Sequence, residues 1–146
     1  MSGTFDDWLA VTRTIARYGR LADQRRSGEM ADLFTPDGGM LMFRPRAQEP
    51  AESPRGREQL ITAFDALGAF VATSHVLSPS DVELDGDSAR AHTYCMSHHI
   101  SETPEGRVRF TLADRYEDAL VRVDGRWLFC ERRKYTDWTE SAPLRR

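Results

Sequence analysis

The apolar positions in the first part of the chain recur at helical spacing. Between residues 5 and 26 they fall three or four residues apart, which places them on one face of an amphipathic helix. Thr4 and Asp7 form a capping pair at its start. A short second helix is expected next, closed by the turn residues 36–39, and a third helix is expected over 58–68.

The rest of the chain is predicted to be mainly strands separated by turn residues. A proline-rich stretch over 44–56 is expected to form an exposed loop. The predicted strands cover 40–43, 71–84, 88–101, 107–123 and 126–137. This order predicts one α+β domain over residues 1–146. Three helices would pack on one face of a curved antiparallel sheet, with a pocket between the two layers.

Charge and composition exclude several classes of function. The net charge is −3 and the sequence pI is about 5.8, with arginines interspersed among acids, so no nucleic-acid-binding surface is expected. No apolar run approaches the length of a membrane span. Cys95 and Cys130 lie in apolar runs without metal-ligand spacing, which is typical of reduced core residues. We therefore expect a cytoplasmic protein that binds neither nucleic acid nor membrane.

Three titratable residues do not fit the pattern around them. His75 lies in the strand-like stretch FVATSHVL, and Asp23 lies close to a helix C-terminus, where the helix dipole disfavours an acid. Taken alone, His75 would be a satisfied core histidine and Asp23 a solvated charge. Asp114 occupies one face of a strand otherwise apolar at Val108, Phe110, Leu112, Tyr116 and Leu120. A buried carboxylate needs a partner, so Asp114 either pairs with Arg132 or takes part in chemistry.

Four segments in order carry a family resemblance. They are RYGRLADQRRSGEMADLFTPDGG, GREQLITAF, TSHVLSPSDVELDGDSARA and DRYEDALVRVDGRWLFCERRKYTDW, and together they span nearly the whole chain. This set resembles the SnoaL-like branch of the nuclear transport factor 2-like superfamily. The resemblance implies a cone-shaped, cystatin-like α+β barrel with a deep pocket. The superfamily includes dehydratases, dehydrochlorinases, isomerases, polyketide cyclases and non-catalytic members, so its fold alone does not determine function.

The resemblance also implies roles for individual residues. Asp23 and His75 match the catalytic Asp–His dyad of members similar to hexachlorocyclohexane dehydrochlorinase and scytalone dehydratase. Tyr18 is similar in placement to a tyrosine of bile acid 7α-dehydratase, although a plain core aromatic is an equal alternative. Arg132 matches a pocket arginine of the dehydrochlorinase. Asp114 departs from the small residue usual in relatives.

These residues predict a cofactor-independent, metal-free enzyme of the dehydratase type. A carboxylate bonded to one imidazole nitrogen leaves the other free as a base. His75 would remove an acidic proton, with the resulting charge stabilised by Tyr18 or Arg132. The expected substrate is small, apolar and cyclic, because the predicted pocket wall is largely aromatic. The wall residues are Phe43, Phe64, Phe70, Leu112, Tyr116 and Trp138, and Asp114 and Arg132 add polar groups.

Two alternatives remain open at this point. A polyketide cyclase or a ketosteroid-type isomerase would share the pocket and the acid–base pair. A non-catalytic small-molecule binding module would need the pocket but not the dyad. Self-association into a homodimer or homotrimer is also expected, because Tyr94, Met96 and Ile100 would place apolar side chains on the outer face of the sheet.

Overall fold

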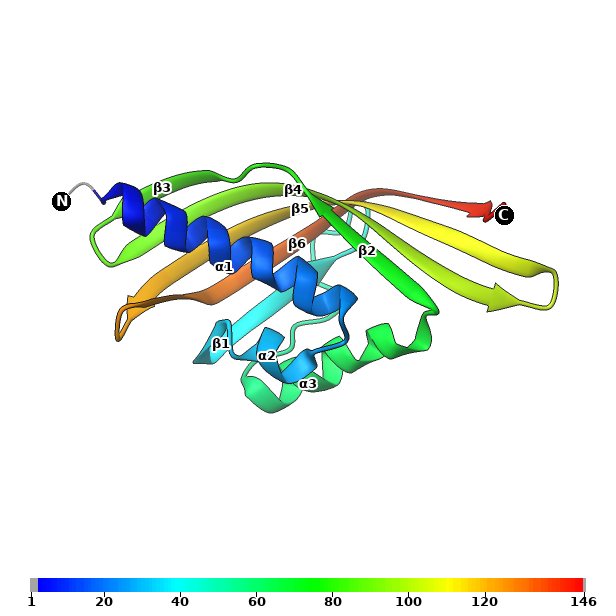
Figure 1. The fold of residues 1–146 in the computed structure, drawn as a ribbon, viewed down its shortest axis with the longest axis horizontal. Coiled ribbons are helices and arrows are strands. Elements are labelled where there is room, and N and C mark those ends of the chain that lie inside the picture. The colour runs from blue at the N-terminus through cyan, green and yellow to red at the C-terminus, as the bar shows by residue number, and fades with distance from the viewer. Residues whose placement is uncertain (1–2, 146) are drawn as a thin grey trace.

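Helices and a long curved sheet form two layers in this computed structural model, which describes residues 3–145. Figure 1 shows α1 lying across one face of the sheet, with α2 and α3 beside it. The α+β prediction is therefore confirmed, with a curved sheet that does not close. The elements are α1 (Phe5–Asp23), α2 (Ser27–Ala31), β1 (Phe34–Phe43), α3 (Arg57–Asp65), a 3-10 turn (Ala66–Ala69), β2 (Ala72–Leu77), β3 (Asp81–Asp85), β4 (Ser88–Thr103), β5 (Gly106–Val123) and β6 (Arg126–Pro143).

The first helix begins as predicted but ends earlier. Thr4 and Asp7 form a reciprocal capping box. The helix stops at Asp23 because Arg25 adopts a left-handed backbone with φ of 60°. The N–H groups of Arg25 and Arg26 then bond back to the carbonyls of Ala22 and Leu21, as in a Schellman motif. Glycine usually marks that position, so the sequence did not reveal this end.

The segment after α1 differs most from the prediction. The expected turn at 36–39 is part of strand β1, and the preceding helix is only five residues long. Phe34 pairs with Phe129 and Gly39 with Glu131, so the residues between them bulge out of the ladder. A Cβ at Gly38 would lie 2.9 Å from the Phe129 carbonyl oxygen, so only glycine fits there without movement. Turn-forming residues here build a bulge instead of ending an element.

The sheet has the order β1-β6-β5-β4-β2, with β3 also pairing with β4. The expected strand over 71–84 is broken at Ser78–Ser80 into β2 and β3, which both pair with β4. The prediction of a wholly antiparallel sheet is wrong at one edge, because β1 runs parallel to β6. The chain leaves β1 through the loop over 44–56 and α3, and it returns at the opposite edge as β2. That crossover puts α3 on the same side as α1 (Figure 1).

Two irregularities in the β5–β6 ladder decide which side chains face the helices. One extra residue in β6 lies between the pairs Leu120–Phe129 and Ala119–Glu131, and another lies between the pairs Asp114–Thr136 and Ala113–Trp138. Each bulge reverses the alternation of side chains along the strand. Arg132, Lys134 and Thr136 therefore lie on the inner, helix-facing side, opposite Asp118, Tyr116 and Asp114.

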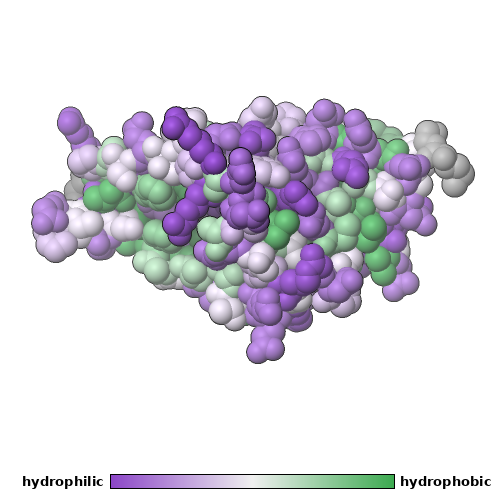
Figure 2. Space-filling model, turned by 180° about the vertical axis from the view of Figure 1, so that it is seen from behind, coloured by the Kyte–Doolittle hydropathy of each residue, from purple (hydrophilic) through white to green (hydrophobic). Residues whose placement is uncertain are grey.

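The core lies between the helices and this inner face. Its aromatic part brings together Tyr18, Phe34, Phe64, Tyr116 and Phe129, each at most 5% exposed. The proline-rich loop folds back on β1 through bridges at Gly39–Arg55 and Met42–Glu52. Figure 2, the view from behind, shows hydrophilic side chains over much of the far face, with apolar patches between them. Within residues 3–145, no helix is long and apolar enough to cross a membrane.

Candidate functional site

Asp23 and His75 meet where the end of α1 lies against β2. His75 Nδ1 is 2.7 Å from Asp23 Oδ1, and the His75 backbone N–H donates to Asp23 Oδ2 at 3.0 Å. The His75 side chain is 8% exposed and that of Asp23 is 29% exposed. An ionised carboxylate can only accept, so this geometry puts a proton on Nδ1 and leaves Nε2 of a neutral imidazole as an acceptor.

A glycine allows this close approach of helix and strand. A Cβ at Gly19 would lie 2.7 Å from Leu77 Cδ1 and 3.4 Å from His75 Cβ. A larger side chain here would therefore require the Leu77 side chain or the helix to shift. Gly19 lies one helical turn before Asp23, so this packing also sets the position of the carboxylate.

Further polar groups hold the carboxylate in place. Thr73 Oγ1 donates to Asp23 Oδ1 at 2.9 Å, and Arg25 Nη1 donates to Thr73 Oγ1 at 2.8 Å. Asp23 therefore has three polar contacts that offset its unfavourable place at a helix C-terminus. Sequence reasoning missed Thr73 and Arg25. Thr73 could have been found from its position two residues before His75, on the same side of β2.

A second imidazole lies beside the dyad. The rings of His75 and His99 have centroids 5.9 Å apart, and the His99 ring is 4.5 Å from that of Phe70. Burial, followed by the neighbouring charges of His75, Lys134 and Arg25, lowers the pKa of His99 from 6.5 to about 4. His99 is thus neutral at neutral pH. No role was assigned to it from the sequence.

A row of polar residues leads away from the dyad across the inner face. Ser97 pairs directly with His75, and its hydroxyl donates to Asp114 Oδ2 at 3.2 Å. Thr136 Oγ1 donates to Asp114 Oδ1 at 2.6 Å, and Lys134 Nζ lies 4.0 Å from Asp114 Oδ2. Leu112 pairs with Ser97 and lies half-buried on the same face. The row therefore runs through four neighbouring strands, β2, β4, β5 and β6.

The expected pairing of Asp114 with Arg132 is wrong. Arg132 donates from Nε and Nη2 to the two carboxylate oxygens of Asp118, at 2.8 and 3.0 Å, and both side chains are 0% exposed. The bulge at Cys130 causes this choice of partner, because it turns Arg132 inward opposite Asp118. The Arg132 guanidinium also stacks on the rings of Tyr18, Tyr116 and Phe129, at 3.8 to 4.5 Å from their centroids.

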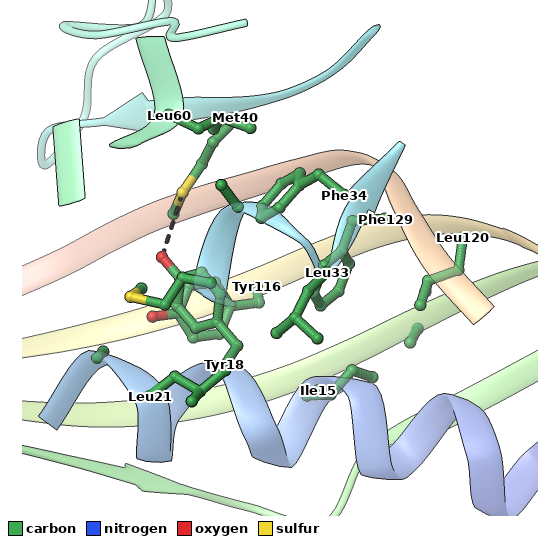
Figure 3. Packing of buried hydrophobic residues seen from close by; sticks show 14 of the residues in the cluster. Ile15, Tyr18, Leu21, Leu33, Phe34, Met40, Leu60, Tyr116, Leu120 and Phe129 are labelled. Carbon is green, nitrogen blue, oxygen red and sulfur yellow. Dashed lines mark hydrogen bonds between the residues drawn. The ribbon is translucent and has the colours of Figure 1, made fainter. Parts of the chain in front are cut away.

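Tyr18 lies within the aromatic core. Its hydroxyl donates to Met40 Sδ at 3.4 Å, the contact drawn as a dashed line in Figure 3. Burial raises the pKa of Tyr18 far above its ordinary value, so the phenol stays protonated. These surroundings favour the core-aromatic alternative.

The other residues assigned to the pocket wall lie in different parts of the structure. Phe64 and Tyr116 are 5% and 2% exposed and pack against Tyr18. Phe43 stacks on Tyr135, which lies next to the inward Lys134 and so faces the opposite side. Trp138 pairs with Ala113 on the outer face and is 49% exposed, so the expectation that it lines the pocket is wrong.

A surface groove of about 650 Å³ lies apart from these residues, between α1, α2 and the β5–β6 turn. Its lining includes Arg13, Arg17 and Arg126 but neither Asp23 nor His75. Within residues 3–145, no group of three or more histidines, cysteines or acids is arranged to hold a metal ion. Cys95 and Cys130 are both free thiols.

Comparison with known proteins places this chain in a family. A SnoaL-like domain model matches residues 4–133, so the chain belongs to the SnoaL-like family. An uncharacterized protein of Mycobacterium tuberculosis is 26% identical over 126 residues, covering 86% of this chain and 82% of the relative.

Two solved structures share the fold. A provisionally assigned scytalone dehydratase from Novosphingobium aromaticivorans has a TM-score of 0.81 and 23% identity, covering 95% of this chain and 89% of that one. A type 2 hexachlorocyclohexane dehydrochlorinase also has a TM-score of 0.81, with 15% identity, covering 97% and 94% of the two chains. At these identities the likeness establishes a shared fold and not the reaction.

Proposed function

We propose that this protein is a cofactor-independent acid–base enzyme, a dehydratase-type lyase that acts on an apolar cyclic hydroxy or keto compound. One observation carries the proposal: the Asp23 carboxylate lies 2.7 Å from Nδ1 of an imidazole whose side chain is 8% exposed. A module that only binds ligands has no need of a carboxylate and imidazole aligned through three polar contacts.

In the proposed reaction, His75 Nε2 removes a proton from a carbon made acidic by a neighbouring group. Asp23 keeps the opposite nitrogen protonated and stabilises the imidazolium that forms. The imidazolium then returns its proton to the departing hydroxyl, which leaves as water. His99 is neutral at neutral pH, so it adds no positive charge that would oppose protonation of His75.

The test is turnover by variants with the fold intact. A panel of cyclic hydroxy-ketones is screened first by ligand-dependent melting and then by product analysis. His75→Gln is expected to lower kcat by about 10²- to 10⁴-fold, and Asp23→Asn is also expected to lower kcat. His92→Gln serves as the control, because His92 is 61% exposed and its side chain lies on the face of β4 that points away from the helices. Turnover by His75→Gln equal to that of the wild type would remove the proposal.

Product analysis also separates the rival reactions. Loss of water indicates a lyase, whereas a product of unchanged mass indicates an isomerase or a cyclase. Ligand binding without turnover by the wild type would indicate a binding module. The cytoplasmic location and the self-association expected from the sequence stay predictions.

A further inference from the structure

Proton removal by His75 creates negative charge on the substrate, and something must stabilise it. A general base supplies about 10²- to 10⁴-fold, so a group at the developing oxyanion is needed as well. The two residues expected to serve are both committed elsewhere. The Tyr18 hydroxyl donates to Met40, and Arg132 is 0% exposed and bonded to Asp118.

Lys134 is a cation that remains available on the inner face. It lies on β6 opposite Tyr116 of β5 and next to Met42 of β1, and its side chain is 21% exposed. The bulge at Cys130 turns it toward the helices; without that extra residue it would face outward.

The polar row connects Lys134 with the dyad. Ser97 pairs with His75 and donates to Asp114, and Lys134 Nζ is 4.0 Å from the same Asp114 oxygen. The strands that carry His75 and Lys134 are three positions apart, about 14 Å across the sheet. His75 aligns with Leu112 of β5 and Lys134 with Tyr116, so the two residues are also offset by four positions, about 13 Å along the strands. The contacts through Ser97 and Asp114 bridge much of that span, and a ring-bearing substrate would lie along this row.

Asp114 positions the ammonium group without consuming its donors. The hydroxyls of Ser97 and Thr136 supply hydrogen bonds to the carboxylate. At 4.0 Å, Lys134 Nζ is attracted by Asp114 but is beyond hydrogen-bond distance, so its N–H groups are free for a ligand. Arg25, which follows the end of α1, is instead bonded to Thr73 and to the carbonyls of Ala22 and Phe70.

We propose that Lys134, positioned by Asp114, stabilises the enolate oxygen formed when His75 removes a proton, and that the substrate is therefore a carbonyl compound. This inference rests on the proposed function. The C–H electron pair becomes the carbon–carbon double bond of the enolate, and the carbonyl π pair moves to the oxygen facing Lys134. When the carbonyl re-forms, the pair expels the β-hydroxyl, which takes the proton from His75 and leaves as water.

The electrostatics of the neighbouring imidazole agree with this placement. The charge of Lys134 contributes to the lowered pKa of His99, so its field extends along the inner face toward the dyad. In the loss of HCl from a haloalkane the charge develops on the departing chloride, which is a weaker hydrogen-bond acceptor than an enolate oxygen. The ammonium group thus favours a hydroxy-ketone over a chlorinated hydrocarbon.

The test uses a stable oxyanion in place of the enolate. Dissociation constants of para-nitrophenolate and of its neutral analogue para-nitroanisole are measured for the wild type and for folded variants, with circular dichroism as the check on folding. The wild type is expected to prefer the phenolate. Lys134→Met should reduce that preference by about 10- to 100-fold, the value of a hydrogen bond to a charged group. Lys134→Arg should retain most of it.

Arg133→Met is the matched control, because Arg133 is the next residue of β6, is 44% exposed and bonds to Glu131. No phenolate preference in the wild type, an unchanged preference in Lys134→Met, or an equal loss in Arg133→Met would each overturn the proposal. Failure of the proposed function appears differently: His75→Gln would keep its turnover while the phenolate preference stayed dependent on Lys134.

Discussion

Arg132 and Asp118 lie directly opposite each other on β6 and β5 and form a two-pronged ion pair that is completely buried. Three aromatic rings surround the guanidinium, and Nη1 of Arg132 has no hydrogen-bond partner within residues 3–145. The ion pair is therefore part of the packed core between the sheet and α1. It holds the middle of the sheet to the aromatic core below α1.

Breaking that pair should strongly destabilise the fold. Asp118→Asn leaves a buried guanidinium without its counter-ion, so we expect the free energy of unfolding to fall by about 3–5 kcal/mol, measured by urea denaturation. Replacing both partners with apolar residues, Asp118→Leu with Arg132→Met, should restore most of the loss. Asp137→Asn, which breaks the exposed pair with Arg115, should cost no more than about 1 kcal/mol. A similar small cost for Asp118→Asn would contradict a structural role.

The Arg132–Asp118 pair also shows what could not be predicted from the sequence. Helical periodicity and turn residues were enough for the α+β layout, and the family resemblance brought Asp23 and His75 together. The register of β6 could not be read, because one extra residue at Cys130 decides whether Arg132 and Lys134 face inward. Alternation counted from the turn at 124–125 would put Arg132 outside, opposite Glu117. The partner of Asp114 was therefore assigned wrongly, and Lys134 was missed.

Backbone geometry explains the other differences between the predicted and the observed elements. Arg25 takes a left-handed conformation that glycine usually marks, so the end of α1 was placed too late. Pro36 and Gly38 are typical of a turn, but here they form a bulge within β1, between the pairs Phe34–Phe129 and Gly39–Glu131. In both places tertiary contacts outweigh local preference.

Gly19 should be intolerant of a change that usually stabilises helices. Gly19→Ala adds a methyl 2.7 Å from Leu77 Cδ1 and 3.4 Å from His75 Cβ. We expect a loss of about 1 kcal/mol in the free energy of unfolding, from overpacking, in place of the usual gain. Turnover should also fall, because a shift of α1 at Gly19 would change the distance between Asp23 and His75. Gly28→Ala is the control: its methyl would meet only Arg57, at 3.6 Å, so a gain of about 0.5–1 kcal/mol is expected.

Stability should depend on pH through His99. Its pKa is lowered to about 4 in the folded protein, by burial and by the charges of His75, Lys134 and Arg25, against 6.5 for a free histidine, while Asp23 acts weakly in the other direction. Between these values the unfolded chain binds a proton that the folded chain does not. The free energy of unfolding therefore falls as the pH drops from about 6.5 toward about 4.

Urea denaturation at a series of pH values measures this effect. His99→Phe keeps a ring beside Phe70 but cannot titrate, so its stability should change less across the same pH window. His92→Gln removes an exposed histidine and should leave the pH dependence as in the wild type. If the free energy of unfolding depended on pH as steeply in His99→Phe as in the wild type, other groups would be responsible for that dependence.

The expected self-association can be tested on the outer face of the sheet. Val76, Met96, Ala113 and Trp138 pair in sequence across β2, β4, β5 and β6, so they form one row on that face. Val76 is 59% exposed and Trp138 is 49% exposed, an apolar surface that a second copy can cover. We expect the wild type to sediment as a dimer or trimer and Trp138→Lys to sediment as a monomer. Val123→Lys, which changes an exposed apolar residue at the end of β5, should leave the assembly intact. A wild type that is monomeric at all concentrations would show that this row stays uncovered.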